Sequence, residues 1–261
     1  VDPENKTIFV FVDAFVNQKT LITDTLYNSF GTMANYIGAG AGSLDFTSFP
    51  CLFSNEGLVQ GGALIGIIDM ESSLGVAHGW EAVSEPLKVT EAENNRTISL
   101  DWEDATKKYR KIVSAHMKKD IEKVDFFNLT KNYPLGISKF GAEMVVRDAF
   151  KEENGVIFTL DNIEQGSHVH ILYGNLDALL KGAKQARNLA VGGSIKSDKE
   201  VLIIDCISRV LFMDEDYPLE IAELDPEGRG FGALSLGEIA NNGDAYLEIF
   251  NKTAVVCSLD G

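Results

Sequence analysis

The chain has 261 residues, of which 45% are hydrophobic and 24% charged, a composition typical of a globular protein with a sizeable core. The formal net charge of −16 predicts repulsion of nucleic acids and anionic membranes, so neither is expected as a partner. No apolar run of about 18 residues occurs, so no transmembrane helix is expected. The first residues show no leader-like pattern, and we expect a cytoplasmic protein.

The first third of the chain combines strand and helix patterns. A continuous apolar run over residues 7–15 predicts a buried strand, and the apolar spacing of residues 18–34 predicts an amphipathic helix. A short strand then leads into a glycine turn within residues 36–46. Residues 50–70 are expected to form two strands around a turn near Asn55-Glu56-Gly57, and residues 73–90 another strand pair.

Hairpins dominate the middle of the chain. Residues 87–102 alternate in character on either side of Asn94-Asn95, which favours a hairpin, and residues 103–119 predict an amphipathic helix. Short strand patterns follow, before a helix over residues 176–191. These strand patterns lie in residues 133–138, 143–150, 155–163 and 168–175. The last part combines an apolar strand from Val201, a helix around residues 218–224 and strands within 231–239 and 245–259.

Two segments of the chain share an order of elements. The segment from Ile8 and the segment from Val201 both run from an apolar strand through a helix to a glycine-containing turn and a further strand. We therefore expect an α/β to α+β fold, with two related βα lobes, mixed and antiparallel sheets and a hairpin-rich middle. A chance similarity of two βα units is the alternative.

Motifs of catalysis and nucleotide binding are weak. Gly38, Gly40 and Gly42 form a glycine turn, but it follows a helix and does not match the dinucleotide fingerprint. Close approach of the backbone to another strand or to a small ligand explains these glycines better. Cys206 follows Asp205 directly, but adjacent strand residues point to opposite faces and form no nucleophile–base pair. A cysteine-dependent hydrolase is therefore the least favoured function.

Cysteines and histidines give no metal site. The three cysteines, Cys51, Cys206 and Cys257, show no C-x-x-C spacing, which argues against a disulfide framework and structural zinc. His168 and His170 share one face of a predicted strand, but no third ligand is evident. We expect no bound metal ion.

Charged residues at the ends of apolar runs are candidates for ligand binding. Arg147 and Arg209 each follow such a run, where an arginine either pairs with a structural carboxylate or binds an anionic ligand. Asp205 and Glu238 are similarly placed, and a buried carboxylate needs a partner. Arginines and carboxylates that converge on one cleft would suit a zwitterion such as an amino acid.

A series of short motifs resembles the FIST sensory domain family. The motifs are "GVAHGWEAVSEPLKVTEAENN", "YPLGI", "VVRD", "IEQGSHV", "IIDCISR", "FGALSLGEI" and "FNKTAVV", in the order of the family. The resemblance implies that residues 1–80 form a partial N-terminal lobe, the second half of the FIST N-terminal region, and that residues 81–261 form the FIST C-terminal domain. An upstream βα unit of the family would then be missing, which could leave a ligand site incomplete.

The resemblance implies a cytoplasmic, non-catalytic sensory domain of signal transduction. Its output partner would be a protein such as a histidine kinase, a chemoreceptor or a diguanylate cyclase. We expect a small ligand, an amino acid or small carboxylate, whose binding is transmitted by lobe movement. The candidate ligand-binding residues are Gly38, Gly40, Gly42, His78, Trp80, Arg147, Asp205, Arg209 and Glu238.

A haem-based nitric oxide sensor is the alternative function. Iron needs an axial side chain, and His78 lies nearest a glycine-lined aromatic element, so His78 is the candidate haem ligand. The family tolerates glutamine at this position, and glutamine replaces histidine in hydrogen bonds but is a poor iron ligand. Hydrogen bonding to a ligand, or a strand-end histidine satisfied by the backbone, are the other interpretations. Outside the haem alternative, no cofactor is expected.

Overall fold

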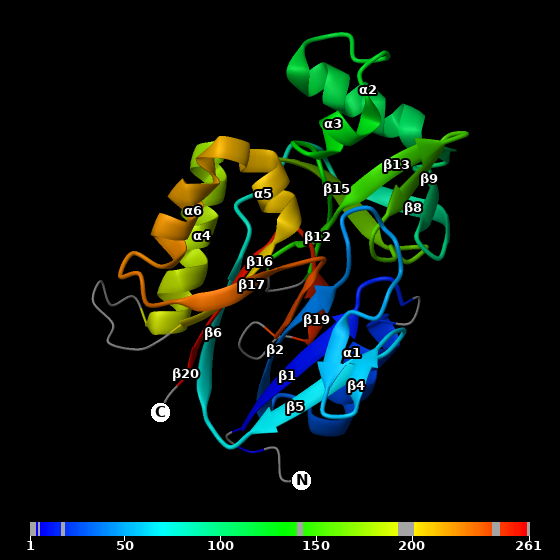
Figure 1. Cartoon of the computed structure of the whole chain (residues 1–261). Coiled ribbons are helices and arrows are strands. Elements are labelled where there is room, and N and C mark those ends of the chain that lie inside the picture. The colour runs from blue at the N-terminus through cyan, green and yellow to red at the C-terminus, as the bar shows by residue number, and fades with distance from the viewer. Residues whose placement is uncertain are drawn as a thin grey trace. The chain divides into compact units, whose positions relative to one another are not determined.

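The computed structural model describes residues 4, 6–16, 19–139, 143–192, 201–241 and 246–259 (Figure 1). The chain divides into two compact units. Unit 1 combines Val1–His78 with Leu180–Gly261, and unit 2 is Gly79–Leu179. Helices combine with mixed and antiparallel sheets, which confirms the fold class expected from the sequence. The predicted division at residue 80 stays a prediction.

The first sheet of unit 1 contains a parallel βαβ segment. In order across the sheet, its strands are β19 (Glu248–Phe250), β18 (Glu238–Ala240), β2 (Ala34–Ala41), β1 (Lys6–Asp13) and β5 (Ala63–Ile68). The strands β1 and β2 are parallel and are joined by α1 (Lys19–Phe30), whereas β5 runs antiparallel on the other side of β1. Alternate side chains of β1, such as Ile8 and Val10, pack against Ile22 and Leu26 of α1.

The second sheet of unit 1 repeats this arrangement. In order, its strands are β17 (Phe231–Ser235), β16 (Val201–Cys206), β20 (Ala254–Leu259) and β6 (Ser72–Ala77). The parallel strands β16 and β17 are joined by α5 (Ile207–Met213), η1 (Asp214–Asp216) and α6 (Tyr217–Leu224), and β20 runs antiparallel to β16. Ala186 of α4 (Leu176–Val191) and Leu224 of α6 belong to one apolar cluster with Ile203 and Val256. Both helices therefore cover the same face of this sheet (Figure 1).

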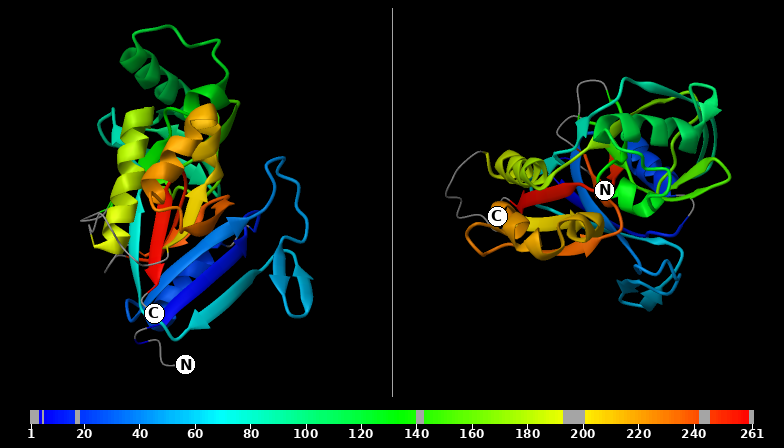
Figure 2. Two further views of the ribbon diagram at one scale, coloured as in Figure 1. Left: turned by 60° about the vertical axis from the view of Figure 1, so that its left-hand side comes forward. Right: turned by 90° about the horizontal axis from the view of Figure 1, so that it is seen from above.

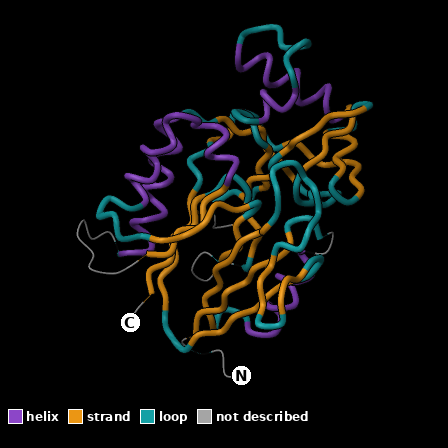
Figure 3. Tube along the Cα trace, in the orientation of Figure 1, coloured by secondary structure: helices purple, strands orange, loops and turns teal. Residues whose placement is uncertain are grey.

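Unit 2 is the predicted hairpin-rich middle. Its sheet follows the order β12 (Val145–Arg147), β11 (Leu135–Ile137), β15 (His168–Tyr173), β8 (Leu87–Glu93), β9 (Arg96–Leu100), β14 (Val156–Thr159) and β13 (Ala149–Glu153), while β10 (Glu103–Asp104) pairs with β9 and β7 (Glu81–Ala82) with β15. The predicted hairpin forms between β8 and β9, with Asn94 at a φ of 54° in its turn. The helices α2 (Ala105–Met117) and α3 (Phe126–Thr130) lie at one end of these strands (Figures 2 and 3).

Residues 50–70 differ from the two strands expected from the sequence. A separate hairpin of β3 (Leu52–Ser54) and β4 (Gly57–Val59) precedes β5. The break falls at Gly61, which has a φ of 70° and donates its N–H to Oδ2 of Asp13 at 2.8 Å. The prediction of a single strand through this glycine turn is therefore wrong.

Candidate functional site

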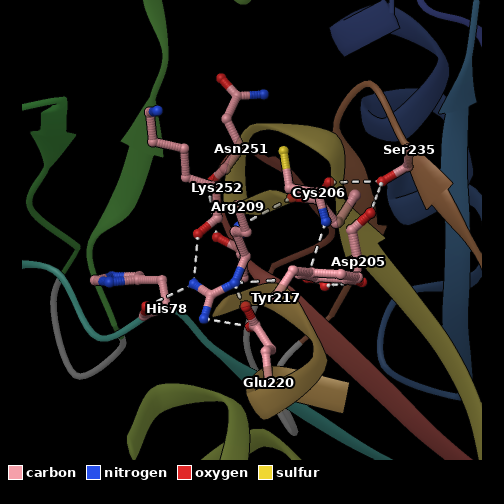
Figure 4. A network of polar contacts seen from close by, with 11 residues as sticks. His78, Asp205, Cys206, Arg209, Tyr217, Glu220, Ser235, Asn251 and Lys252 are labelled. Atoms are coloured by element: carbon pink, nitrogen blue, oxygen red, sulfur yellow. Dashed lines mark hydrogen bonds and ion pairs between the residues drawn. The ribbon is translucent and has the colours of Figure 1, made fainter. Parts of the chain in front are cut away.

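A buried network of charged side chains surrounds Arg209 on α5 (Figure 4). The guanidinium donates from Nε to Oε1 of Glu220 at 2.6 Å. Its Nη1 donates to the backbone carbonyls of His78 at 2.7 Å and Lys252 at 3.0 Å. The side chain of Arg209 is fully buried. One cation thus joins α5 to α6, to the residue after β6 and to the turn between β19 and β20.

Asp205 organises the junction of β16 and α5. Its Oδ1 accepts the N–H of Cys206 at 3.0 Å and lies 3.5 Å from Nε of Arg209, four residues further along the chain. Its Oδ2 accepts the hydroxyl of Tyr217 at 2.8 Å. The first and last residues of the motif "DCISR", Asp205 and Arg209, therefore form an ion pair across the junction of the strand and the helix. The carboxylate of Asp205 also binds Tyr217, the first residue of α6.

Glu238 links the two sheets of unit 1. From β18 its Oε1 lies 2.6 Å from the hydroxyl of Ser235, which is also 3.2 Å from the carbonyl oxygen of Asp205. Its Oε2 accepts the N–H of Thr253 at 3.2 Å. Burial raises the pKa of the Glu238 carboxyl well above its usual range.

The remaining acids of the network share one positive charge. Burial raises the pKa of Glu220 from 4.5 to about 7 and also raises the pKa of Asp205. Burial opposes the charged form of Arg209, but Glu220 and Asp205 outweigh it and keep the pKa of Arg209 above its ordinary value. Within the described residues, Oε2 of Glu220 is buried and has no hydrogen-bond partner. Such a cluster is costly to bury and depends on Arg209 for compensation.

The turn between β19 and β20 carries polar side chains that this network holds in place. Lys252 has a φ of 52°, and its carbonyl accepts from Arg209. The hydroxyl of Thr253 donates to the carbonyl of Asn251 at 2.7 Å. Figure 4 shows that the side chains of Asn251, Lys252 and Cys206 project to one side, away from Glu220. Both Asn251 and Lys252 are buried, and Nδ2 of Asn251 donates to the carbonyl of Phe250 at 2.9 Å.

The predicted glycine turn is wrong, because Gly38 and Gly40 lie within the strand β2, where they serve close packing in unit 1. A Cβ on Gly38 would lie 1.7 Å from the carbonyl oxygen of Val10, and one on Gly40 would lie 2.3 Å from that of Leu236. A Cβ on Gly42 would meet the side chain of Leu236 at 2.8 Å. The backbone of Gly40 also exchanges hydrogen bonds with the segment that precedes Glu238. These glycines let β2 approach β1 and the β17–β18 connection.

The other predicted residues divide between the two units. His78 lies directly after β6, is buried, and contributes its carbonyl to the Arg209 network. Trp80 and Arg147 belong to unit 2. Trp80 is buried against Gly174, and Arg147 donates to the carbonyls of Asn162 and Val146 at 3.2 and 3.3 Å. The structure therefore joins His78, Asp205, Arg209 and Glu238 through one network of unit 1.

Sequence patterns did not predict four members of this site: Tyr217, Glu220, Asn251 and Lys252. The available signal was the run "FNKTAVV", in which three polar residues interrupt apolar strand residues. All three are buried, so this polar run is part of the interior. Glu220 carried no such signal, because a glutamate in a short helix is usually exposed.

Neither a metal centre nor a membrane span is found among the described residues. Those residues contain no group of three or more His, Cys, Asp or Glu side chains arranged to hold a metal ion. Nδ1 of His116 contacts the hydroxyl of Tyr133, and Nδ1 of His170 contacts the carbonyl of Ser84, each at 2.9 Å. None of the described helices combines the length and apolar character that crossing a membrane requires.

Comparison with known families gives two matches. The FIST N domain matches residues 3–103, and the FIST C domain matches residues 105–241. Together they cover most of the chain and confirm the resemblance in the sequence. The N-domain match begins at residue 3, whereas only the second half of that region was expected. No curated protein matches the chain.

Proposed function

Because the chain belongs to the FIST family of signal-transduction sensory domains, we propose that it binds a small ligand and reports that ligand to a signalling partner. The ligand is an amino acid or a small carboxylate. The family suggests a signalling role without catalysis, and the proposal includes no chemical step. A cytoplasmic location is part of the same proposal.

The observation that carries the proposal is the fixed turn at Asn251 and Lys252. The ammonium group of Lys252 can donate a charge-assisted hydrogen bond to a carboxylate, and beside it lies the carboxamide of Asn251, whose Nδ2 also donates to the carbonyl of Phe250 at 2.9 Å. Arg209 is occupied by two backbone carbonyls and Glu220, so we assign it a positioning role rather than a ligand contact. Glu238 has a similar role, since it binds the N–H of Thr253 at the end of the same turn.

The hydrogen bonds of the network provide a route by which ligand binding at the turn affects α5 and α6. Arg209 ties the backbone of Lys252 to α5, and Glu220 ties Arg209 to α6. A ligand that prefers one arrangement of the turn therefore shifts the populations of both helices. The lobe movement that we propose begins with this shift. The output partner is a protein such as a histidine kinase, a chemoreceptor or a diguanylate cyclase.

Thermal melting against a panel of amino acids, small carboxylates and haemin tests the proposal. A compound that binds only the folded state raises Tm once its concentration exceeds its Kd. We expect one carboxylate to raise Tm, and its amide analogue, the matched control, to have no effect. A panel without any shift contradicts the proposal. A response to haemin alone, with a Soret band that His78→Gln abolishes, supports the haem alternative instead.

A further inference from the structure

Unit 2 carries a basic surface on a strongly acidic chain. Residues 106–131, which span α2, α3 and their connection, contain eight of the 23 lysines and arginines and three acidic residues. The chain as a whole has a net charge of −16. Positive charge is therefore concentrated in one helical segment, while acidic residues predominate in the rest of the chain.

Five lysines of this segment are exposed and form no salt bridge within the part of the chain that the structure describes. We call them the lysine surface: Lys107, Lys111, Lys118, Lys119 and Lys123. The neighbouring Lys108 differs, because it pairs with Asp101 at 3.3 Å and Glu103 at 3.1 Å. Lys107 and Lys111 are four residues apart and share one face of α2. Neither of the two lysines forms a salt bridge with a described residue, although Glu103, whose pKa is lowered first by its hydrogen bond with Lys108, is close enough to both for their charges to lower it further.

Trp102 occupies a strained turn at the start of the same helix. Asp101 and Trp102 connect β9 to β10 with φ values of 50° and 62°, a left-handed conformation that favours glycine or asparagine. Trp102 is 79% exposed, and the ammonium nitrogen of Lys88 lies 5.9 Å from the centre of its ring. Core packing therefore does not explain a tryptophan in this turn. An exposed residue in a strained conformation is a candidate for function.

A hollow lies along the side of α2. It has a volume of about 480 Å³ and includes Lys107, Lys111 and Ile121 in its wall. The hydroxyl of Thr106 also belongs to this wall and is buried without a hydrogen-bond partner among the described residues. Three acidic residues line the hollow as well: Asp104, Asp120 and Glu122. The wall of this hollow thus combines basic and acidic side chains, so attraction of an acidic segment rests on the exposed lysine surface and not on the hollow.

We propose that Trp102 and the lysine surface form a docking surface for an acidic segment of a partner protein. Charge complementarity attracts the segment and speeds its association, while Trp102 serves as the apolar anchor. A membrane is not the occupant, because the apolar face of α2, with Tyr109 and Val113, is already packed in the core of unit 2.

Tryptophan fluorescence provides a direct test. The chain has two tryptophans, and Trp80 is only 3% exposed. A change in tryptophan emission on binding at the surface therefore comes from Trp102. The probe is a synthetic peptide of Glu and Asp around a central pair of leucines, added to the full chain at low salt. We expect a saturable blue shift that weakens as salt is added. The same peptide with Lys in place of its acidic residues should give no shift.

Anisotropy of the labelled peptide then compares variants. The triple variant Lys107→Glu, Lys111→Glu and Lys118→Glu should bind at least about tenfold more weakly. The control changes two exposed lysines of α4, Lys181→Glu and Lys184→Glu, and should bind like the native chain, although Lys184 also pairs with Glu223 at 3.4 Å.

Trp102→Gly distinguishes a docking surface with an apolar anchor from binding by electrostatic attraction alone. Glycine suits the turn, so this variant should be at least as stable as the native chain and yet bind the peptide more weakly. The proposal is overturned by a lack of saturable binding, by full affinity in Trp102→Gly or the triple variant, or by equal loss in the α4 control. Tighter binding to phosphatidylserine vesicles or single-stranded DNA than to the peptide would also overturn it.

Discussion

The interiors of the two units are built differently. Unit 1 buries Asp205, Arg209, Glu220 and Glu238 in one polar network. The described interior of unit 2 contains an apolar cluster around its sheet and α2, in which the hydroxyl of Tyr109 donates to the carbonyl of Tyr133, and it also buries Arg147, Asp148 and Asp161. Burying charge costs free energy unless it is compensated, whereas apolar burial stabilises directly. The buried charged network of unit 1 lies next to the turn of Asn251 and Lys252. In unit 2, the lysines of the lysine surface are exposed.

The first way to test this contrast compares two arginines. Arg209 and Arg110 each donate to two backbone carbonyls and a carboxylate, but the side chain of Arg110 is 17% exposed and that of Arg209 is fully buried. Arg209→Met should lower the free energy of unfolding by about 3–5 kcal/mol, because two acids lose their buried cation. Arg110→Met should cost about half as much. Urea denaturation measures both, and equal losses would contradict the contrast.

A core substitution in unit 2 should have an effect that is independent of pH. Leu135 is fully buried in the apolar cluster, so Leu135→Ala should cost about 3 kcal/mol. Because the loss comes from a cavity, the difference between variant and native chain should be the same at pH 6 and pH 8. A difference that changes between these pH values would show that ionisable groups also determine the stability of this core.

The polar network of unit 1 predicts the opposite behaviour with pH. The pKa of Glu220 rises from 4.5 to about 7 on folding, so the folded chain binds a proton more tightly than the unfolded chain. This stability is present below pH 4.5 and is lost as the pH rises through 7. The shift corresponds to roughly 3 kcal/mol. The unfolding free energy should therefore fall between pH 5 and pH 8, as denaturation at several pH values would show.

Glu238→Gln isolates one part of that pH dependence. Glutamine keeps the shape of the protonated acid but does not titrate, and the raised pKa of Glu238 acts in the same direction as that of Glu220. The variant should be at least as stable as the native chain at pH 8 and should lose less stability between pH 5 and pH 8. The exposed Glu153→Gln is the control and should leave the slope unchanged. A clear loss of stability at pH 8 in Glu238→Gln would mean that the buried acid is ionised.

The smallest effect is expected at the start of α2. Asp104 is the N-cap, and its Oδ1 accepts the N–H of Lys107 at 3.0 Å. Asp104→Ala should cost about 1 kcal/mol. Asp125 caps the much shorter α3 in the same way, and Asp125→Ala should cost less. A loss of several kcal/mol in Asp104→Ala would indicate that unit 2 also depends on a charged side chain.

Local patterns predicted much of this fold and only part of the site. The helix over residues 176–191 and the hairpin at Asn94-Asn95 were predicted because their periodicity and turn residues act locally. Arg209 and Asp205 stood out as charges next to a buried strand. Glu220 did not, because its burial depends on an arginine eleven residues away in sequence and on another helix. Trp102 shows the converse, since a tryptophan is expected to be buried and this one is exposed.

The role of the turn at Asn251 and Lys252 is tested most directly by calorimetric titration of the carboxylate that raises Tm most. Lys252→Met removes the ammonium group of the site, and Lys19→Met removes that of another buried lysine, on α1. Lys252→Met should weaken binding at least about tenfold, equivalent to about 1.4 kcal/mol, while Lys19→Met binds like the native chain. Unchanged affinity in Lys252→Met would contradict the assignment of the ligand site to this turn.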